Sequence, residues 1–236
     1  MSSKTDIGQI FRMTVSVLRA NASAFLLFTG LMAVVTKLLM LAMGLDHVLV
    51  EATSGAGNLA ALPGGPIVGT ASLLLIAIVP YLVALSAISH GTAAFLAGTP
   101  VTVGECIAVS VRRMPEILLL GVVAGLGVFL AGMFLVIPAV ILIVLWYVAP
   151  PVLIIERVGV MRSLGRSIEL TRGHRLMIFG LIFVLMVVTF LVSALVSSIF
   201  LPFGILPAQI AAVAIDAVLS AVGAVACSVT YCALAS

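Results

Sequence analysis

Charged residues are scarce in this chain of 236 residues. Only 8% of them are Asp, Glu, Lys or Arg, whereas 64% are hydrophobic. An ordinary soluble domain has roughly 25% charged and about 45–50% apolar residues. Eight acidic and eleven basic side chains are too few to cover a water-soluble fold of this size. The composition therefore excludes an ordinary soluble domain and predicts an all-α integral membrane protein, because helices satisfy their own backbone hydrogen bonds in lipid.

Residue patterns that carry chemistry are also lacking. The three cysteines, Cys106, Cys227 and Cys232, form no C-x-x-C pair, and the three histidines show no H-x-x-x-H spacing. The sequence contains no G-x-S-x-G motif, no phosphate-binding P-loop and no paired carboxylates within one apolar run. We therefore interpret the cysteines as small apolar residues and expect no metal, no cofactor and no enzymatic activity.

Six apolar segments are predicted to cross the bilayer, which takes about 20 residues of helix. The expected spans are residues 22–44, 67–97, 117–135, 139–155, 176–199 and 209–234. The apolar run over residues 117–155 is about twice as long as one span, so we place a reversal around Val136-Ile137-Pro138. Pro150 and Pro151 lie shortly before Glu156, and we expect them to mark the exit of the fourth span.

With these six spans, the basic residues collect on one side of the membrane. Ten of the eleven lie before the first span, between spans two and three, or between spans four and five: Lys4, Arg12, Arg19, Arg112, Arg113, Arg157, Arg162, Arg166, Arg172 and Arg175. The opposite connections contain only Asp46 and Glu51 as charged residues. Because Lys and Arg accumulate in cytoplasmic loops, both termini are predicted to be cytoplasmic. The net charge of +3 thus reports on topology, and we expect no nucleic-acid partner.

An amphipathic segment with arginine near its end leads into spans one, three and five. These segments are residues 8–19, 104–113 and 158–172. In the third, Met161, Leu164 and Ile168 form the predicted apolar face. Such helices lie along the membrane surface on the cytoplasmic side. Two interpretations stay open: three repeated units of surface helix, span, turn and span, or the general tendency of cytoplasmic segments before spans to be amphipathic and basic.

The stretch Pro151-Val152-Leu153-Ile154-Ile155-Glu156 is followed by Ser163-Leu164-Gly165-Arg166-Ser167-Ile168-Glu169-Leu170-Thr171-Arg172-Gly173. Together they resemble a signature of the YciC-like inner-membrane proteins and of the membrane domain fused, in some bacteria, to glycerophosphoryl diester phosphodiesterases. The resemblance is sharp over the 23 positions from Pro151 to Gly173. It implies a helical bundle in the bacterial inner membrane, with no established activity of the membrane part. We expect no phosphodiesterase activity, because the catalytic barrel would need about 250 further residues.

Seven charged residues in and near this signature form the candidate site: Glu156, Arg157, Arg162, Arg166, Glu169, Arg172 and Arg175. Glu156 is placed to pair with Arg162, Arg166 or Arg172, and Glu169 lies three residues from both Arg166 and Arg172. One interpretation is an interfacial clamp between two spans. In it, Pro151 ends the fourth span and Gly173 ends the surface helix. The other is an arginine cluster that binds anionic lipid head groups, each base contributing about 1 kcal/mol.

Ionisable residues within spans are costly and are therefore the default candidates for function. Lys37 in the first span and Asp216 in the sixth lie at similar depths with opposite charges, which predicts a buried ion pair. The alternatives are that Lys37 reaches the outer interface, or that the two residues line a proton or cation pathway. His90 is interpreted as a hydrogen-bonded structural residue. Gly121-x-x-x-Gly125 predicts close helix packing, within the monomer or in an oligomer.

Three functional hypotheses follow. The leading one is a non-enzymatic membrane protein that organises lipid or accompanies a larger complex. Its partners are membrane lipids with anionic head groups on the cytoplasmic side, and either another copy of the chain or a membrane-complex subunit. The second is a small-solute permease or channel with Lys37, Asp216 and His90 as its polar path. The third is a membrane enzyme acting on lipid head groups, which requires Glu156 and His174 to converge.

Overall fold

The computed structural model describes residues 7–43, 65–98 and 103–235, and within these ranges the chain forms helices and no strand. Six helical segments are long and apolar enough to cross a membrane. They are Phe25–Ala42, Val79–Leu96, Met114–Gly132, Val136–Ile155, Arg175–Phe203 and Pro207–Ala235. The chain is therefore an all-α multi-pass membrane protein, as the composition predicts.

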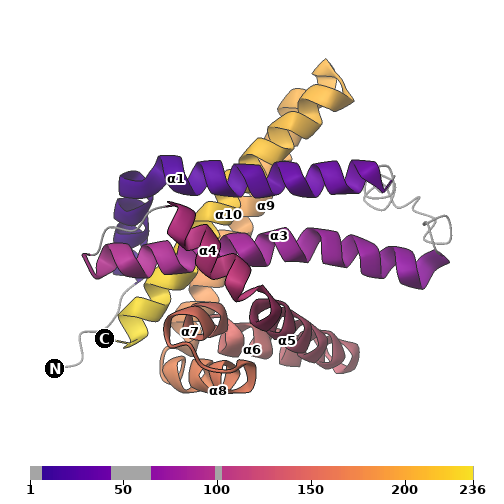
Figure 1. The fold of residues 1–236 in the computed structure, drawn as a ribbon. Coiled ribbons are helices and arrows are strands. Elements are labelled where there is room, and N and C mark those ends of the chain that lie inside the picture. The colour runs from indigo at the N-terminus through magenta and orange to yellow at the C-terminus, as the bar shows by residue number, and fades with distance from the viewer. Residues whose placement is uncertain (1–6, 44–64, 99–102, 236) are drawn as a thin grey trace.

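The first helix, α1 (Ile7–Ala42), bends sharply at Asn21, whose backbone leaves helical geometry with φ −123° and ψ 20°. The bend separates a segment that carries Arg12 and Arg19 from the apolar part of α1, as Figure 1 shows. The Asn21 side-chain amide donates to the carbonyl oxygen of Val17 at 3.3 Å. The expected start of the first span at residue 22 thus coincides with this bend.

The central bundle consists of α1, α3 (Gly65–Leu96) and α10 (Ile205–Ala235). Their shared core is apolar and buried: Ile10, Val17, Phe25, Leu85, Ile88, Ala221, Ala224, Val225 and Val229. The alanines of α10 allow the helix backbones to approach closely. Ser228 of α10 also donates to Ser89 of α3 at 3.0 Å in this core. Helix α9 (Arg175–Phe200) packs along α10 and is joined to it through the short turn η2 (Leu201–Phe203).

A second group of helices begins with the hairpin of α5 (Met114–Phe134) and α6 (Val136–Trp146). The reversal lies at Leu135, which is extended (φ −163°, ψ 149°), one residue before the expected Val136-Ile137-Pro138. Two glycines of α5 meet large side chains. A Cβ at Gly127 would lie 2.6 Å from the Trp146 ring, and one at Gly121 would lie 2.6 Å from Leu82 of α3. Gly121 therefore packs within the monomer.

The fourth span is interrupted between α6 and α7 (Ala149–Ile155), and this corrects the expectation that Pro150 and Pro151 mark its exit. The two prolines lie in the first turn of α7, where a missing backbone N–H is tolerated. The helix then continues through Val152 and Leu153, both fully buried. The break falls inside the candidate span Val136–Ile155 rather than at its end.

Side chains from other helices satisfy backbone carbonyls at this break. Because proline has no N–H, Pro151 cannot donate to the carbonyl of Tyr147 in the usual helical pattern. That oxygen accepts instead from the thiol of Cys227 on α10, with an Sγ–O distance of 3.1 Å. The hydroxyl of Ser167 donates to the carbonyl oxygen of Leu145 at 2.7 Å.

Two short amphipathic helices, α4 (Val103–Arg112) and α8 (Val160–Leu170), precede α5 and α9. The packed face of α8 differs from the predicted one. It consists of Val160, Ser163, Leu164 and Ser167, whereas Met161 and Ile168 are exposed. Both serines pack inward because their hydroxyls find carbonyl acceptors. The order of short helix, span and span occurs three times if the segment of α1 before Asn21 counts as the first short helix.

Both ends of the described chain lie on the same side of the bundle. In Figure 1 the N-terminal end of α1 and the C-terminal ends of α3 and α10 lie at the left, whereas the C-terminal end of α1 and the N-terminal end of α3 lie at the right. The C-terminal part of α10 also contacts α7 and α8. The candidate site around Glu156 therefore lies at the end of the bundle that holds both termini.

Candidate functional site

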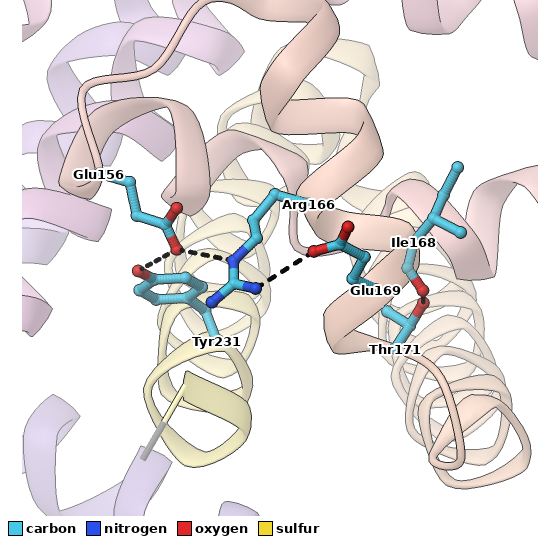
Figure 2. A network of polar contacts seen from close by, with 6 residues as sticks. All are labelled: Glu156, Arg166, Ile168, Glu169, Thr171 and Tyr231. Atoms are coloured by element: carbon cyan, nitrogen blue, oxygen red, sulfur yellow. Dashed lines mark hydrogen bonds and ion pairs between the residues drawn. The ribbon is translucent and has the colours of Figure 1, made fainter.

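Four side chains from three helical segments form a polar network, shown in Figure 2. Glu156 follows α7, Arg166 and Glu169 belong to α8, and Tyr231 belongs to α10. Glu156 Oε1 accepts hydrogen bonds from Arg166 Nε at 3.5 Å and from the Tyr231 hydroxyl at 3.1 Å. Arg166 Nη1 also donates to Glu169 Oε2 at 3.2 Å. One guanidinium thus lies between two carboxylates.

The network holds α8 against the end of the fourth span and against α10. The side chains of Glu156 and Arg166 are 27% and 44% exposed, so water screens their ion pair, and pairs of this kind contribute about 0–1 kcal/mol. Tyr231 is only 6% exposed, and its hydrogen bond to a carboxylate is the stronger link. The hydrogen bond to Glu169 and the charge of Glu156 raise the pKa of Arg166, which therefore stays cationic.

The other arginines of the candidate site make no ion pair within the described residues. They are Arg157, Arg162, Arg172 and Arg175, and all four are exposed. Of the three partners predicted for Glu156, only Arg166 pairs with it, and Glu169 pairs with Arg166 rather than with Arg172. A basic groove of about 480 Å³ lies between the end of α8 and the start of α9, with Glu169, Arg172 and Arg175 in its lining.

Two backbone positions near this site adopt left-handed geometry. Gly173 has a φ of 89°, which glycine tolerates and which agrees with its predicted place after the surface helix. Arg157 has a φ of 54°, the one positive value of a non-glycine residue in the described chain. An L-residue in this region costs roughly 1–2 kcal/mol. The turn between α7 and α8 is thus strained at an exposed arginine.

The expected ion pair between Lys37 and Asp216 is not formed within the described residues. Both residues instead line one cavity of about 360 Å³ between α1, α3 and α10, together with polar groups of Thr36, Tyr81 and Gln209. Asp216 accepts a hydrogen bond from Ser193 of α9 at 3.4 Å. The two charges therefore face a shared space without a direct contact.

His90 does not belong to that cavity. It lines a separate one of about 540 Å³, formed by the last turns of α3, the end of α4 and the α7–α8 turn. Arg112, Arg113 and Arg157 line the same space. Between the two cavities, α3 is buried at Leu85, Ile88 and Ser89, which are 6%, 1% and 0% exposed. Lys37, Asp216 and His90 hence do not line a single cavity.

The third hypothesis required Glu156 and His174 to converge. The hydrogen-bond partners of Glu156 in the described chain are Arg166 and Tyr231. The Nδ1 atom of His174 is buried and has no hydrogen-bond partner among the described residues. The two side chains thus form no hydrogen bond with each other.

Two contributions to the site were not foreseen from the sequence. Tyr231 lies within an apolar helix, and its distance of 75 positions from Glu156 gave no sign of the contact. The one feature of the sequence that could have indicated the contact is a tyrosine hydroxyl near the predicted cytoplasmic end of the sixth span. The grouping of Arg112 and Arg113 with Arg157 was also missed. The sequence indicated only that all three arginines lie on the same, basic side of the membrane.

Three residues of the network, Glu156, Arg166 and Glu169, belong to the segment Pro151 to Gly173, which resembles the YciC-like signature. Outside that segment, the network includes Tyr231. Family membership itself stays a prediction. Comparisons of the chain with protein-family models, curated proteins and solved structures find no match.

Proposed function

We propose that this chain is a non-enzymatic protein of the bacterial inner membrane, related to the YciC-like proteins, that binds anionic lipid head groups at its arginine-bearing end. One observation carries the proposal: Arg157, Arg162, Arg172 and Arg175 are exposed at this end and make no ion pair in the described chain. Cations near a membrane surface attract anionic lipids with about 1 kcal/mol each. The role is to organise lipid or to act as an accessory subunit of a larger membrane complex.

The Arg166 network supports this role by fixing the surface helix. Glu156, Glu169 and Tyr231 hold Arg166, so that Arg162 on the same helix keeps a defined place at the surface. Apolar side chains accompany the bases: Met161 is 71% exposed and Leu176 is 85% exposed. Exposed apolar and basic groups on neighbouring turns suit the boundary between lipid tails and head groups.

The test is retention of lipid in mild detergent, measured by mass spectrometry of the intact protein. The native chain should retain anionic lipid in preference to phosphatidylcholine. Arg162→Gln and Arg172→Gln should each weaken retention about fivefold, corresponding to about 1 kcal/mol. Lys37→Gln is the matched control, because it removes one positive charge from within a span. If the native chain retains neither anionic lipid nor a protein partner, the proposal fails.

The proposed orientation has its own test. With both termini in the cytoplasm, a fluorescent protein fused after Ser236 should fluoresce, and alkaline phosphatase fused at the same position should be inactive. The positive-inside distribution of the ten bases supports this orientation. A dark fluorescent protein together with an active phosphatase would place the C-terminus outside the cytoplasm and contradict the proposed orientation.

A permease or channel is the second candidate, because one specific observation favours it. The cavity between α1, α3 and α10 brings the opposite charges of Lys37 and Asp216 into one space within the spans. This candidate predicts solute flux into liposomes that Asp216→Asn abolishes while the melting temperature is unchanged. Flux that Asp216→Asn leaves intact, or no flux above that of empty liposomes, would remove it.

A further inference from the structure

The cavity that contains His90 combines a basic rim with an apolar wall. Arg112 and Arg113 come from the end of α4, Arg157 comes from the turn after α7, and Ile154 and Ile155 form part of the wall. Its volume of about 540 Å³ exceeds what a bare phosphate ion fills and lies in the roughly 300–1,000 Å³ range of small-molecule sites. The cavity thus has room for a phosphate ester with an apolar part.

The positive charges of this cavity are largely available to a ligand. Arg112 and Arg157 are exposed and make no ion pair within the described chain. Arg113 is paired with Glu116 at 2.9 Å. Glu156 is the neighbour of Arg157 in sequence, but its carboxylate is engaged with Arg166 and Tyr231. No acid is among the described residues that line the cavity.

The backbone at Arg157 provides a second, independent observation. Its φ of 54° belongs to the left-handed region, which non-glycine residues adopt at a cost. Strained residues of this kind cluster at ligand-binding sites, where the strain fixes a side chain in a working position. Glycine would relieve the strain but would remove the guanidinium from the cavity rim.

We infer that this cavity is a specific site for the phosphate group of an anionic phospholipid, with Arg112 and Arg157 as the phosphate-binding residues and the isoleucine wall in contact with the glycerol and acyl part. The inference rests on the proposed function and makes it specific. Guanidinium groups suit this role because they donate two parallel hydrogen bonds to phosphate oxygens. Cavities of this position and charge are known to hold lipid head groups between helices.

The experiment compares two double variants that lose the same charge. Arg112→Gln with Arg157→Gln alters the cavity, and Arg12→Gln with Arg19→Gln alters two exposed arginines of α1 that do not line it. The probe is phosphatidylglycerol, titrated into protein in phosphatidylcholine nanodiscs, with the number of tightly bound lipids as the readout. The cavity variant should lose one tightly bound lipid, with at least a tenfold weaker affinity, and the control variant should keep it.

A charge-neutral variant and a competitor separate the remaining explanations. Ala93→Leu fills the cavity from α3 without changing any charge, and it should also remove the bound lipid. Inorganic phosphate at millimolar concentration should not displace the lipid, because it lacks the apolar part. Complete displacement by phosphate would show that the cavity serves a soluble phosphate ester and would overturn the lipid assignment.

The outcomes distinguish this inference from the proposed function. If both double variants weaken lipid binding equally, the specific site is overturned and the broader arginine surface stands. If the native chain does not prefer phosphatidylglycerol to phosphatidylcholine, both are overturned. Melting temperatures of the two arginine double variants should stay within about 2 °C of the native value, since substitutions at exposed sites without partners have small effects.

Discussion

The hydroxyl of Tyr231 donates a hydrogen bond to the carboxylate of Glu156 at 3.1 Å, joining the last turns of α10 to the end of the fourth span. Tyr231 is buried, and Glu156 is held from its other side by Arg166. This contact links the C-terminal helix to the segment that carries the arginines. Through Glu156, the packing of α10 therefore affects the position of α8 and its arginines.

Tyr231→Phe should lower the free energy of unfolding by about 1.5 kcal/mol, because a hydrogen bond to a charged group is lost. Tyr147→Phe is a suitable control, since the Tyr147 hydroxyl is buried without a partner in the described chain. Its removal should leave stability unchanged or raise it. Unfolding in detergent, followed by circular dichroism, measures both. Equal effects of the two variants would contradict the importance of the Tyr231–Glu156 contact.

Ser167→Ala should destabilise the protein by about 1 kcal/mol. The substitution removes the donor to the partly buried carbonyl oxygen of Leu145 at the break in the fourth span, and a fully buried carbonyl left unsatisfied costs about 1–3 kcal/mol. Ser198→Ala is the matched control, because the hydroxyl of the exposed Ser198 bonds within its own helix and to no other helix in the described chain. Thermal unfolding of the two variants should differ by several degrees, and identical melting temperatures would argue against this role of Ser167.

Gly127→Ala should lower stability by about 1–3 kcal/mol through overpacking, because its new methyl group would meet the Trp146 ring at 2.6 Å. Gly125 lies on the same helix, and no described residue outside that helix lies within 4 Å of a Cβ added there. Gly125→Ala should raise stability by about 0.5–1 kcal/mol through the better helix propensity of alanine. Chemical unfolding should therefore show a lower free energy of unfolding for Gly127→Ala and a higher one for Gly125→Ala. A loss of stability from both substitutions would show that α5 packs differently.

Arg157→Gly should raise the free energy of unfolding by about 1 kcal/mol, because glycine adopts the left-handed backbone without strain. The same variant should reduce the amount of bound anionic lipid. Arg162→Gly, which places glycine inside α8, should instead lower stability by about 1 kcal/mol. If Arg157→Gly raises stability and also reduces the bound lipid, the strained arginine serves lipid binding rather than folding. Arg157→Gly with unchanged lipid retention would argue against the cavity site.

Much of the fold was predictable from the sequence, because a spanning helix depends on local composition. Six apolar runs, the start of the first span near residue 22 and the reversal near Pro138 follow from length, proline and the position of polar residues. These features did not predict that Pro150 and Pro151 begin a new helix within the fourth span. Proline is compatible both with the end of a helix and with the first turn of another, and the local sequence does not distinguish the two.

Side-chain partners were only partly predictable. Arg166 and Glu169 lie three residues apart on one helix, so their pairing follows from helix geometry. The choice of Arg166 over Arg162 and Arg172 as the partner of Glu156 depends on how α8 is rotated against α6. Ser167 helps to set that rotation, because its hydroxyl donates to the Leu145 carbonyl oxygen of α6, whereas apolarity alone had favoured Met161 and Ile168 as the packed face.

What the sequence by itself determined is the class of protein: an all-α chain with six spans. In lipid, each span must satisfy its backbone hydrogen bonds internally, so local composition is sufficient. Only the tertiary structure decided which polar groups of different helices meet. It separated His90 from Lys37 and Asp216, joined Tyr231 to Glu156, and brought Arg112 and Arg157 to one cavity. Such contacts depend on the packing of helices that are distant in sequence, and helix packing follows the shapes of whole faces rather than local composition.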